Sequence, residues 1–308
     1  PMLGHPNGWH RDTAARLLYE RKSIEVVEEI RCLALQSENS LGRIHALYAL
    51  RGLGQLDPDT LLRSLSDPDS LVRIHAIRLS ELVAPFSTTI CDTLCSMAHD
   101  KDPDVRFQLA FSLGAFTGVD RDQTLVALVK QDGENPWVRT AVQSALWQGS
   151  GEIFFELVTD KSYRNSPSAA SFLISLAFQA SVQKQRKDLL FVIKGLQNLS
   201  ENEQVLMKKI LQGAGLDLEK FFSTEKTNNF RRLLSRWIED AAKIAQDSNQ
   251  PSDDRVNAIH TLQFADFDTA KTQSLFIRLL QSRQPVSCLL YTSDAADDTP
   301  CVDLGGRR

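Results

Sequence analysis

Residues 102–114 read Asp-Pro-Asp-Val-Arg-Phe-Gln-Leu-Ala-Phe-Ser-Leu-Gly, and this pattern recurs along the chain. An Asp and a Pro mark a turn, an Arg follows at a nearly fixed offset, and an apolar helix with small residues near its middle comes next. Related stretches contain Arg11, Arg43, Arg73, Arg106 and Arg139. The steps between these arginines are 32, 30, 33 and 33 residues. A period of this size predicts supersecondary units that stack on one another.

Each unit is expected to be a short helix, a tight turn and a second helix, because apolar residues recur with helical spacing and no stretch alternates like a strand. The sequence therefore predicts an all-α fold, a right-handed α-solenoid of helix pairs. We expect regular repeats over residues 1–149, diverged helical repeats over 150–285 and a disordered tail over 286–308. The diverged part contains the motif once more, with Arg255 in the arginine position.

The turn residues have a mechanical explanation. An Asp before the second helix can accept backbone N–H bonds, and a Pro in its first turn lacks an N–H that would have no partner there. The Arg can reach an Asp in the turn of its own or the neighbouring repeat, which predicts a structural ladder of charges along one edge of the stack. This predicted ladder consists of Arg43, Arg73, Arg106, Arg139, Asp67, Asp102 and Asp104. The alternative is that the arginines form a ligand-binding stripe.

Composition excludes several classes of function. The net charge is −4 and no polybasic block is present, so the sequence predicts no nucleic-acid partner. No run of about 18 apolar residues occurs, so no membrane span is expected. The first residues do not read as a signal peptide, and we expect the sequence to begin inside a longer protein.

Candidate metal ligands are few. Cys91 and Cys95 lie four residues apart on one predicted helix, with His99 one turn further, but no second Cys/His pair at zinc spacing accompanies them. We expect buried or half-buried thiols there, with half of a metal site as the alternative. His45 and His75 occupy equivalent repeat positions and are predicted to be structural. No metal-binding residue is therefore predicted.

No catalytic motif is recognisable. The sequence contains no nucleophile elbow, phosphate loop or His-Glu-x-x-His, and the Gly at 213 and 215 follow a predicted helix and not a strand. Aromatic side chains in such repeats are more often core or inter-repeat anchors than stacking platforms. That role is predicted for Trp9, Trp137, Trp147 and Trp237. We predict no enzyme activity, and no catalytic or cofactor-binding residue.

The last 21 residues, from Cys288 to Arg308, have neither helical nor strand period. They resemble the translated adapter sequences found at the ends of many metagenome-derived fragments. We expect them not to belong to the natural protein; a natural disordered tail is the alternative.

The repeat pattern resembles HEAT (armadillo-like) repeats of the short bacterial type, well over residues 40–149 and weakly over 150–282. Residues 5–21, 44–54 and 105–114 are more specifically similar to PVC-type haem-binding "membrane-bound dehydrogenase" proteins. That family is described as a β-propeller, HEAT repeats and a cytochrome c domain with Cys-x-x-Cys-His. The resemblance implies a chain between the propeller and the cytochrome, a periplasmic or secreted location, and haem c as a cofactor of the parent protein only.

From these observations we predict a non-catalytic scaffold or spacer that contacts a protein partner or adjacent propeller and cytochrome c domains. Open helical stacks suit this role because they expose a long surface. The alternative is a lyase-like HEAT accessory protein that binds a small cofactor or chromophore in its groove. A groove lined by His, Cys and Trp would favour the cofactor, and one lined by Gln, Ser and Arg the scaffold.

Overall fold

The computed structural model describes residues 2–82, 87–199, 203–214, 228–265, 269–280 and 288. All regular structure in these ranges is helical, and no strand occurs in them, which confirms the predicted all-α fold. The chain divides into two compact units, residues 1–172 and 173–308, which are described separately. The finer division at residues 149 and 285 stays a prediction.

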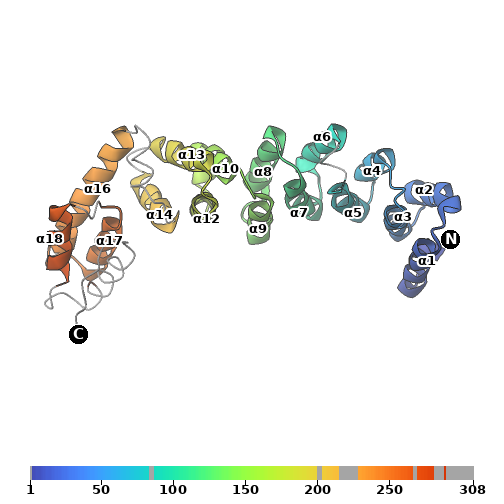
Figure 1. The fold of residues 1–308 in the computed structure, drawn as a ribbon, viewed down its shortest axis with the longest axis horizontal. Helices are drawn as coiled ribbons and strands as arrows, with labels where there is room; N and C mark the ends of the chain where they lie inside the picture. Colours follow the sequence, from blue (N-terminus) through green and yellow to red (C-terminus); the bar gives the residue numbers. More distant parts are fainter. Residues whose placement is uncertain are drawn as a thin grey trace. The chain divides into compact units, whose positions relative to one another are not determined.

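The first unit is a stack of helix pairs (Figure 1). The first helices of the pairs are α2 (Val27–Gln36), α4 (Pro58–Leu65), α6 (Thr88–Ser96), α8 (Val119–Asp132) and α10 (Ser150–Thr159). The second helices are α3 (Ser40–Gly52), α5 (Ser70–Ser80), α7 (Pro103–Ser112) and α9 (Pro136–Ala145), preceded by α1 (Gly8–Arg21) in the same row. Each helix contacts the next one in its own row, from α2 to α10 and from α1 to α9. The predicted solenoid of helix pairs is therefore confirmed in this unit.

Several short helices complete the first unit. They are η1 (Met2–Gly4), η2 (Ile24–Val26), η4 (Met97–His99), η5 (Leu113–Ala115) and α11 (Lys161–Arg164). The last of these, α11, is capped by Asp160, whose side chain accepts a hydrogen bond from the backbone N–H of Ser162. The long helix α12 (Ala169–Gln183) follows it and contains the boundary between the two units.

The second helices begin at capping residues with a constant register. The side chains of Asn39, Asp69, Asp102 and Asn135 each accept a hydrogen bond from the backbone N–H two residues later. Asn7 caps α1 in the same way. In every case the ladder-position arginine lies four residues after the cap, so the cap fixes where the arginine leaves the helix.

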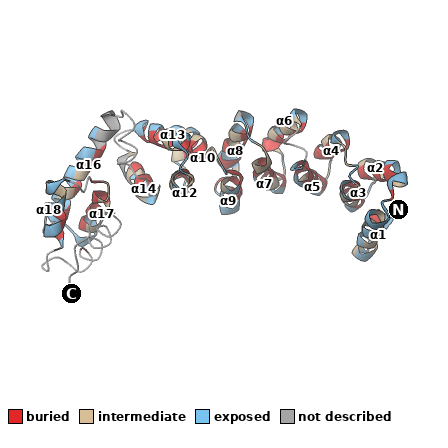
Figure 2. Ribbon diagram, in the orientation of Figure 1, coloured by how far each residue is buried: buried red, intermediate tan, exposed pale blue. Residues whose placement is uncertain are grey.

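The core lies between the two rows, as the buried faces in Figure 2 show. In α7, Val105, Leu109 and Ala110 are fully buried. Phe111, on another side of this helix, is 41% exposed and packs edge-on against Phe107. Small residues keep neighbouring helices close, and the alanines Ala46, Ala76, Ala110 and Ala141 are all fully buried. One stripe of α7 therefore carries most of its packing.

The second unit contains α13 (Arg186–Gln197), α14 (Gln204–Ala214), α16 (Asn228–Gln246), α17 (Ser252–Leu262) and α18 (Ala270–Leu279). Helix α16 contacts α17 and α18, and α14 contacts α17. A core of small and aliphatic residues, including Ala245 and Ile259, joins α16, α17 and α18. Cys288 is buried in this core; the rest of the tail at 286–308 lies outside the described residues.

Candidate functional site

Three of the ladder arginines bind aspartates of the following repeat. We call each such Arg–Asp pair a closed rung. In each one, Nε and Nη2 donate to the two carboxylate oxygens of one Asp over 2.6–2.8 Å. The closed rungs are Arg43–Asp67, Arg73–Asp100 and Arg106–Asp132. All six side chains are largely buried, with the Arg73 and Asp100 side chains only 7% and 11% exposed.

The remaining guanidinium nitrogen binds the arginine's own repeat. Nη1 donates to the backbone oxygen six residues earlier, at Ser37, Asp67, Asp100 or Gly133, over 2.5–2.8 Å. One guanidinium therefore joins the turn of its own repeat to the turn of the next. Charge-assisted bidentate bonds of this kind are among the stronger polar interactions in proteins.

The aspartates of the ladder differ from the predicted set. Asp67 is a rung partner, but Asp102 caps α7 and Asp104 is exposed, with no ion pair to an arginine among the described residues. The Asp102 carboxylate instead accepts the backbone N–H of Asp104, so it caps α7. The partners that sequence reasoning missed are Asp100 and Asp132. A signal existed, because Asp67 and Asp100 each lie six residues before the next ladder arginine.

The central rung is ionised on both sides. Burial disfavours the charge on Asp100, but hydrogen bonds from Arg73 and from the backbone N–H of Asp102 outweigh it and lower the pKa of the carboxyl. The hydrogen bond to Asp100 likewise raises the pKa of Arg73. At neutral pH this pair is a satisfied structural contact, which leaves neither group free for proton transfer or ligand binding.

Arg139 stands apart from the other ladder arginines. Its Nη1 binds the backbone oxygens of Gly133 and Glu134, as in the closed rungs. Its Nε and Nη2 bind no carboxylate in the part of the chain that the structure describes. We call Arg139 the open rung.

The two predicted structural histidines lie on neighbouring second helices. Tyr48 Oη lies 3.1 Å from His75 Nδ1, and the two rings meet edge to face. Burial lowers the pKa of both His45 and His75, with nearby arginine charge as a further cause. Both rings are therefore neutral at pH 7. No group of three or more His, Cys, Asp or Glu side chains with metal-site geometry occurs in the described ranges.

A depression of about 840 Å³ lies beside α6. Its lining includes Cys91, Cys95, Arg121 and Trp147. Both cysteines are half-buried, and neither is in a disulfide. Burial raises the pKa of each thiol, so both are protonated at neutral pH and poor nucleophiles.

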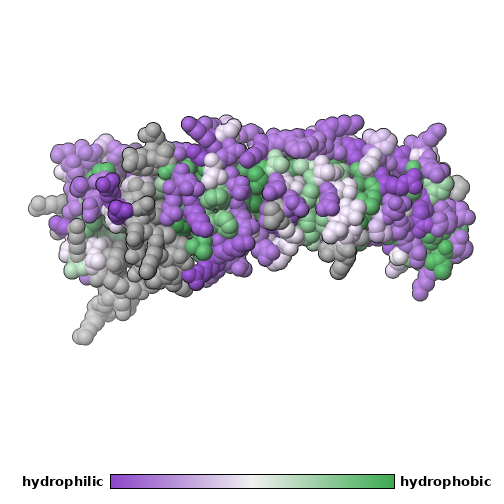
Figure 3. All heavy atoms as spheres, turned by 90° about the horizontal axis from the view of Figure 1, so that it is seen from above, coloured by the Kyte–Doolittle hydropathy of each residue, from purple (hydrophilic) through white to green (hydrophobic). Residues whose placement is uncertain are grey.

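An apolar groove of about 500 Å³ lies between α1 and α2. Its lining includes Leu17, Leu18, Ile30 and Leu33. Helix α1 buries none of its residues, whereas α3 buries seven. Figure 3, which views the side of α2, α4, α6 and α8, shows hydrophobic atoms at the N-terminal end of this face.

The second helices also expose apolar side chains in one register, two residues before the ladder-position arginine. Trp9, Leu41, Leu71 and Trp137 are 67%, 38%, 41% and 69% exposed. We call these four residues the exposed row; Asp104 holds the equivalent position in α7. The prediction that the tryptophans are core or inter-repeat anchors was wrong for Trp9, Trp137 and Trp147, which are 67%, 69% and 60% exposed. Trp9 and Trp137 lie in the first turns of α1 and α9, and Trp147 lies between α9 and α10. Only Trp237 is buried.

Comparison with known families agrees with this architecture. Residues 58–147 match the family model described as HEAT repeats. Residues 58–147 are a HEAT-repeat segment. The HEAT segment spans the three helix pairs from α4 to α9 and contains two closed rungs entire. No curated protein matches the chain.

The comparisons support a helical repeat scaffold and leave the larger dehydrogenase context without support. All-helical HEAT stacks are typically non-catalytic and commonly mediate protein interactions. No helix among the described residues is long and apolar enough to cross a membrane.

Proposed function

We propose that the chain is a non-catalytic scaffold that binds a protein partner along the second helices of its repeats. The observation that carries this proposal is the exposed row. Two tryptophans and two leucines are presented at one register over four second helices, although nothing in the stack requires apolar residues there. Aromatic residues are enriched at protein interfaces, and a regular row of them on a stacked surface suits an extended partner.

The test compares two variants. One carries both Trp9→Ala and Trp137→Ala, and the control variant carries Trp147→Ala. Trp147 is 60% exposed but lies outside the exposed row. Loss of two anchoring tryptophans is expected to weaken partner binding by at least about 100-fold, since interface tryptophans often contribute 2 kcal/mol or more each. Equal binding of the double variant and Trp147→Ala would contradict the proposal.

The specific context we propose is a spacer between a dehydrogenase-like β-propeller and a cytochrome c domain in a larger haem-containing protein. The support is the sequence similarity over residues 5–21, 44–54 and 105–114. The protein would then be periplasmic or secreted, and haem c would belong to the parent and not to this chain. A photo-cross-linker at Leu41 or Leu71, tested against purified propeller and cytochrome domains, examines this context. No cross-link to either domain, or a full reading frame without Cys-x-x-Cys-His, would refute it.

A second candidate is a small cofactor or chromophore held in the depression beside α6. The lining by Cys91, Cys95 and Trp147 favours it. The raised thiol pKa values weigh against covalent attachment at neutral pH, so non-covalent binding is the form to test. Titration with haem should give a saturable absorbance change that Trp147→Ala weakens and Trp137→Ala leaves unchanged. Absence of a saturable change would exclude haem as this ligand.

A further inference from the structure

The apolar groove between α1 and α2 lies beside a second helix that has no first helix. In the other repeats, α2 contacts α3, α4 contacts α5, α8 contacts α9, and η4, which continues α6, contacts α7. Helix α1 belongs to the second row and contacts η1 and α3, and no first helix pairs with it among the described residues. The groove of about 500 Å³ runs along α1 and α2, the two helices that one more first helix would contact.

The short helix η1 has the register of the last turn of a first helix. It lies five to three residues before the cap Asn7, and η4 lies five to three residues before the cap Asp102. Met2 and Met97 therefore hold equivalent positions, yet Met97 is 8% exposed and Met2 is 45% exposed. Met2 occupies the place of a core residue, but its side chain is uncovered.

The face of α1 that lines the groove is buried in the other repeats. At three, six and seven residues after the ladder-position arginine, every side chain in the repeats of α3, α5, α7 and α9 is at most 5% exposed. In α1 the same positions are Ala14, Leu17 and Leu18, which line the groove and are only partly buried. These positions belong to the core between the two rows. Within the described residues, α1 therefore lacks the cover that a first helix gives elsewhere in the stack.

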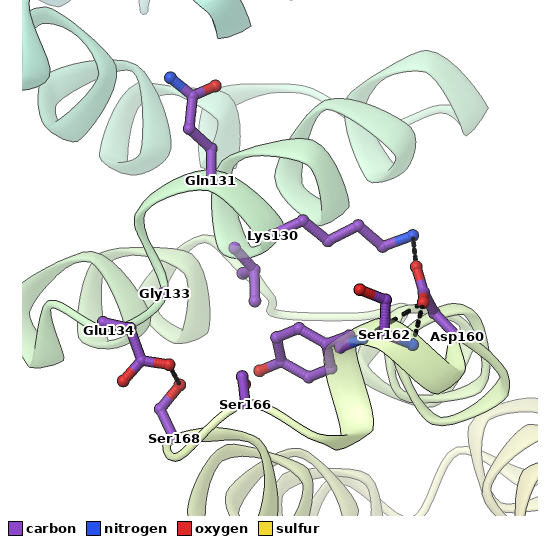
Figure 4. A pocket seen from close by; sticks show the side chains of 10 residues that line it. Lys130, Gln131, Gly133, Glu134, Asp160, Ser162, Ser166 and Ser168 are labelled. Carbon is purple, nitrogen blue, oxygen red and sulfur yellow. Dashed lines mark hydrogen bonds and ion pairs between the residues drawn. The ribbon is translucent and has the colours of Figure 1, made fainter.

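The polar pocket of about 230 Å³ beside α8 and α11 differs from this groove. There Glu134 accepts a hydrogen bond from Ser168, and Lys130 pairs with Asp160, so these four side chains are engaged with one another (Figure 4). The groove between α1 and α2 is lined mainly by aliphatic side chains. Such a lining is stabilised by contact with another apolar surface and not by pairing within itself.

The charges at the groove indicate the direction and the first turn of a helix that would fit it. A first helix runs antiparallel to the second helix that follows it, so one that ended at η1 would begin beside the end of α1, at Arg21. Glu29 also lines the groove, and an arginine between two acidic first turns has a precedent in this row. Arg31 pairs with Glu28 of α2 and with Asp57, the cap of α4. An acidic first turn is therefore expected beside Arg21, where the helix dipole also favours it.

We propose that the groove along α1 and α2 binds an amphipathic helix of a protein partner, supplied in trans. Its apolar stripe would pack against Leu17, Leu18 and Ile30, and its acidic first turn would lie beside Arg21. The bound helix would extend the first row by one member, so its contact with α2 continues the contacts that α2 makes with α4 and α4 with α6. This surface is separate from the exposed row, which lies in the first turns of the second helices.

The groove can be observed directly in the full chain. The protein has three methionines, so methyl-labelled methionine gives three NMR signals, and Met2→Leu identifies the one that lines the groove. The probe is a hydrocarbon-stapled peptide with the sequence of residues 57–66, which form α4 and its caps. It carries the acidic first turn and the apolar stripe of a first helix. The peptide is expected to shift the Met2 signal saturably and to leave the signals of Met97 and Met207 unchanged.

Changes to the peptide and to the chain test the stripe and the charge separately. Serine in place of both Leu61 and Leu65 in the peptide removes the side chains that are buried in α4, and binding should weaken by at least about tenfold. Arg21→Glu in the chain should weaken binding of the original peptide, and a peptide with lysine in place of its two acidic residues should restore it. Arg16→Glu, at an exposed residue of α1 outside the groove lining, is the matched control and should change neither affinity. Leu71→Ser in the exposed row should also leave peptide binding unchanged, which separates this groove from the scaffold surface.

The proposal is overturned by any of four results. One is the absence of a saturable shift of the Met2 signal. Another is equal binding of the leucine and serine peptides, because the groove would then not recognise an apolar stripe. The third is an equal effect of Arg21→Glu and Arg16→Glu. The fourth is a Met2 signal that moves with protein concentration in the absence of peptide, because a second copy of the chain would then occupy the groove.

Discussion

The closed rungs and the open rung use the same arginine in different surroundings. Arg73 and Arg139 follow their helix caps by four residues, and both donate Nη1 to the carbonyl six residues earlier. Only Arg73 has an Asp in front of Nε and Nη2. The arginine is therefore positioned by its own repeat and does not depend on its acidic partner. A repeat can therefore lack the aspartate partner while its arginine keeps the same bond to its own turn.

The second unit shows a third form of the motif. Arg255 is 3% exposed, and its Nε and Nη2 donate to the backbone oxygen of Ala245 over 3.1 and 3.0 Å. Ala245 lies ten residues earlier, so these bonds run back to α16. The same short sequence motif can thus join consecutive repeats or stabilise a single helix pair.

The largest effect is expected from breaking a closed rung. Arg73→Met leaves the carboxylate of Asp100 buried without its partner, which should lower the free energy of unfolding by about 3 kcal/mol or more. Arg139→Met removes only hydrogen bonds to backbone oxygens and should cost about 1 kcal/mol. Urea unfolding of the two variants measures the difference. Equal losses would contradict the distinction between closed and open rungs.

A double variant separates the buried charge from the lost packing. Arg73→Met with Asp100→Leu should be more stable than Arg73→Met alone, because no unpaired charge then remains. If the double variant is less stable by the sum of both single losses, the rung acts through packing alone.

The stability that the Arg73–Asp100 rung contributes should also depend on pH. The pKa of Asp100 is lower in the folded protein than its ordinary value of 3.8, so its contribution is complete above that value and is lost as the pH falls through the folded-state pKa. The stability difference between the natural chain and Asp100→Asn should therefore be largest near neutral pH and shrink below about pH 4. A difference that stays constant from pH 7 to pH 3 would show that ionisation of Asp100 does not contribute.

Local and non-local features differ in how far the sequence predicts them. The helices were predictable because caps and apolar spacing are local properties of the chain. Arg43, Arg73, Arg106 and Asp67 take part in the rungs as the repeat pattern suggested. Which other Asp faces the arginine depends on the distance between adjacent repeats, which no single repeat encodes.

The exposure of the tryptophans shows the same limit. Trp137 and Trp237 are the same residue type on amphipathic helices, yet one is 69% and the other 5% exposed. Only the position of neighbouring helices separates them.

A smaller effect is expected at the helix cap. Asp102→Ala removes the side chain that accepts the backbone N–H of Asp104 at the start of α7, which should cost about 1 kcal/mol. Asp102→Asn keeps an acceptor and should cost only a few tenths of a kcal/mol. Thermal unfolding of both variants provides the measurement. A loss as large as that of Arg73→Met would mean that Asp102 is a rung partner after all.

The smallest effect is expected two residues further on. The side chain of Asp104 is exposed and lies in the first turn of α7, where a negative charge gains only a small benefit from the helix dipole. Asp104→Ala should therefore change the free energy of unfolding by less than about 0.5 kcal/mol. Asp100, Asp102 and Asp104 differ little in sequence terms, so a graded series in urea, large at 100, intermediate at 102 and near zero at 104, separates the rung from the cap and the surface. Equal losses at the three positions would contradict this assignment, because a buried ion pair, a helix cap and an exposed charge contribute different amounts to stability.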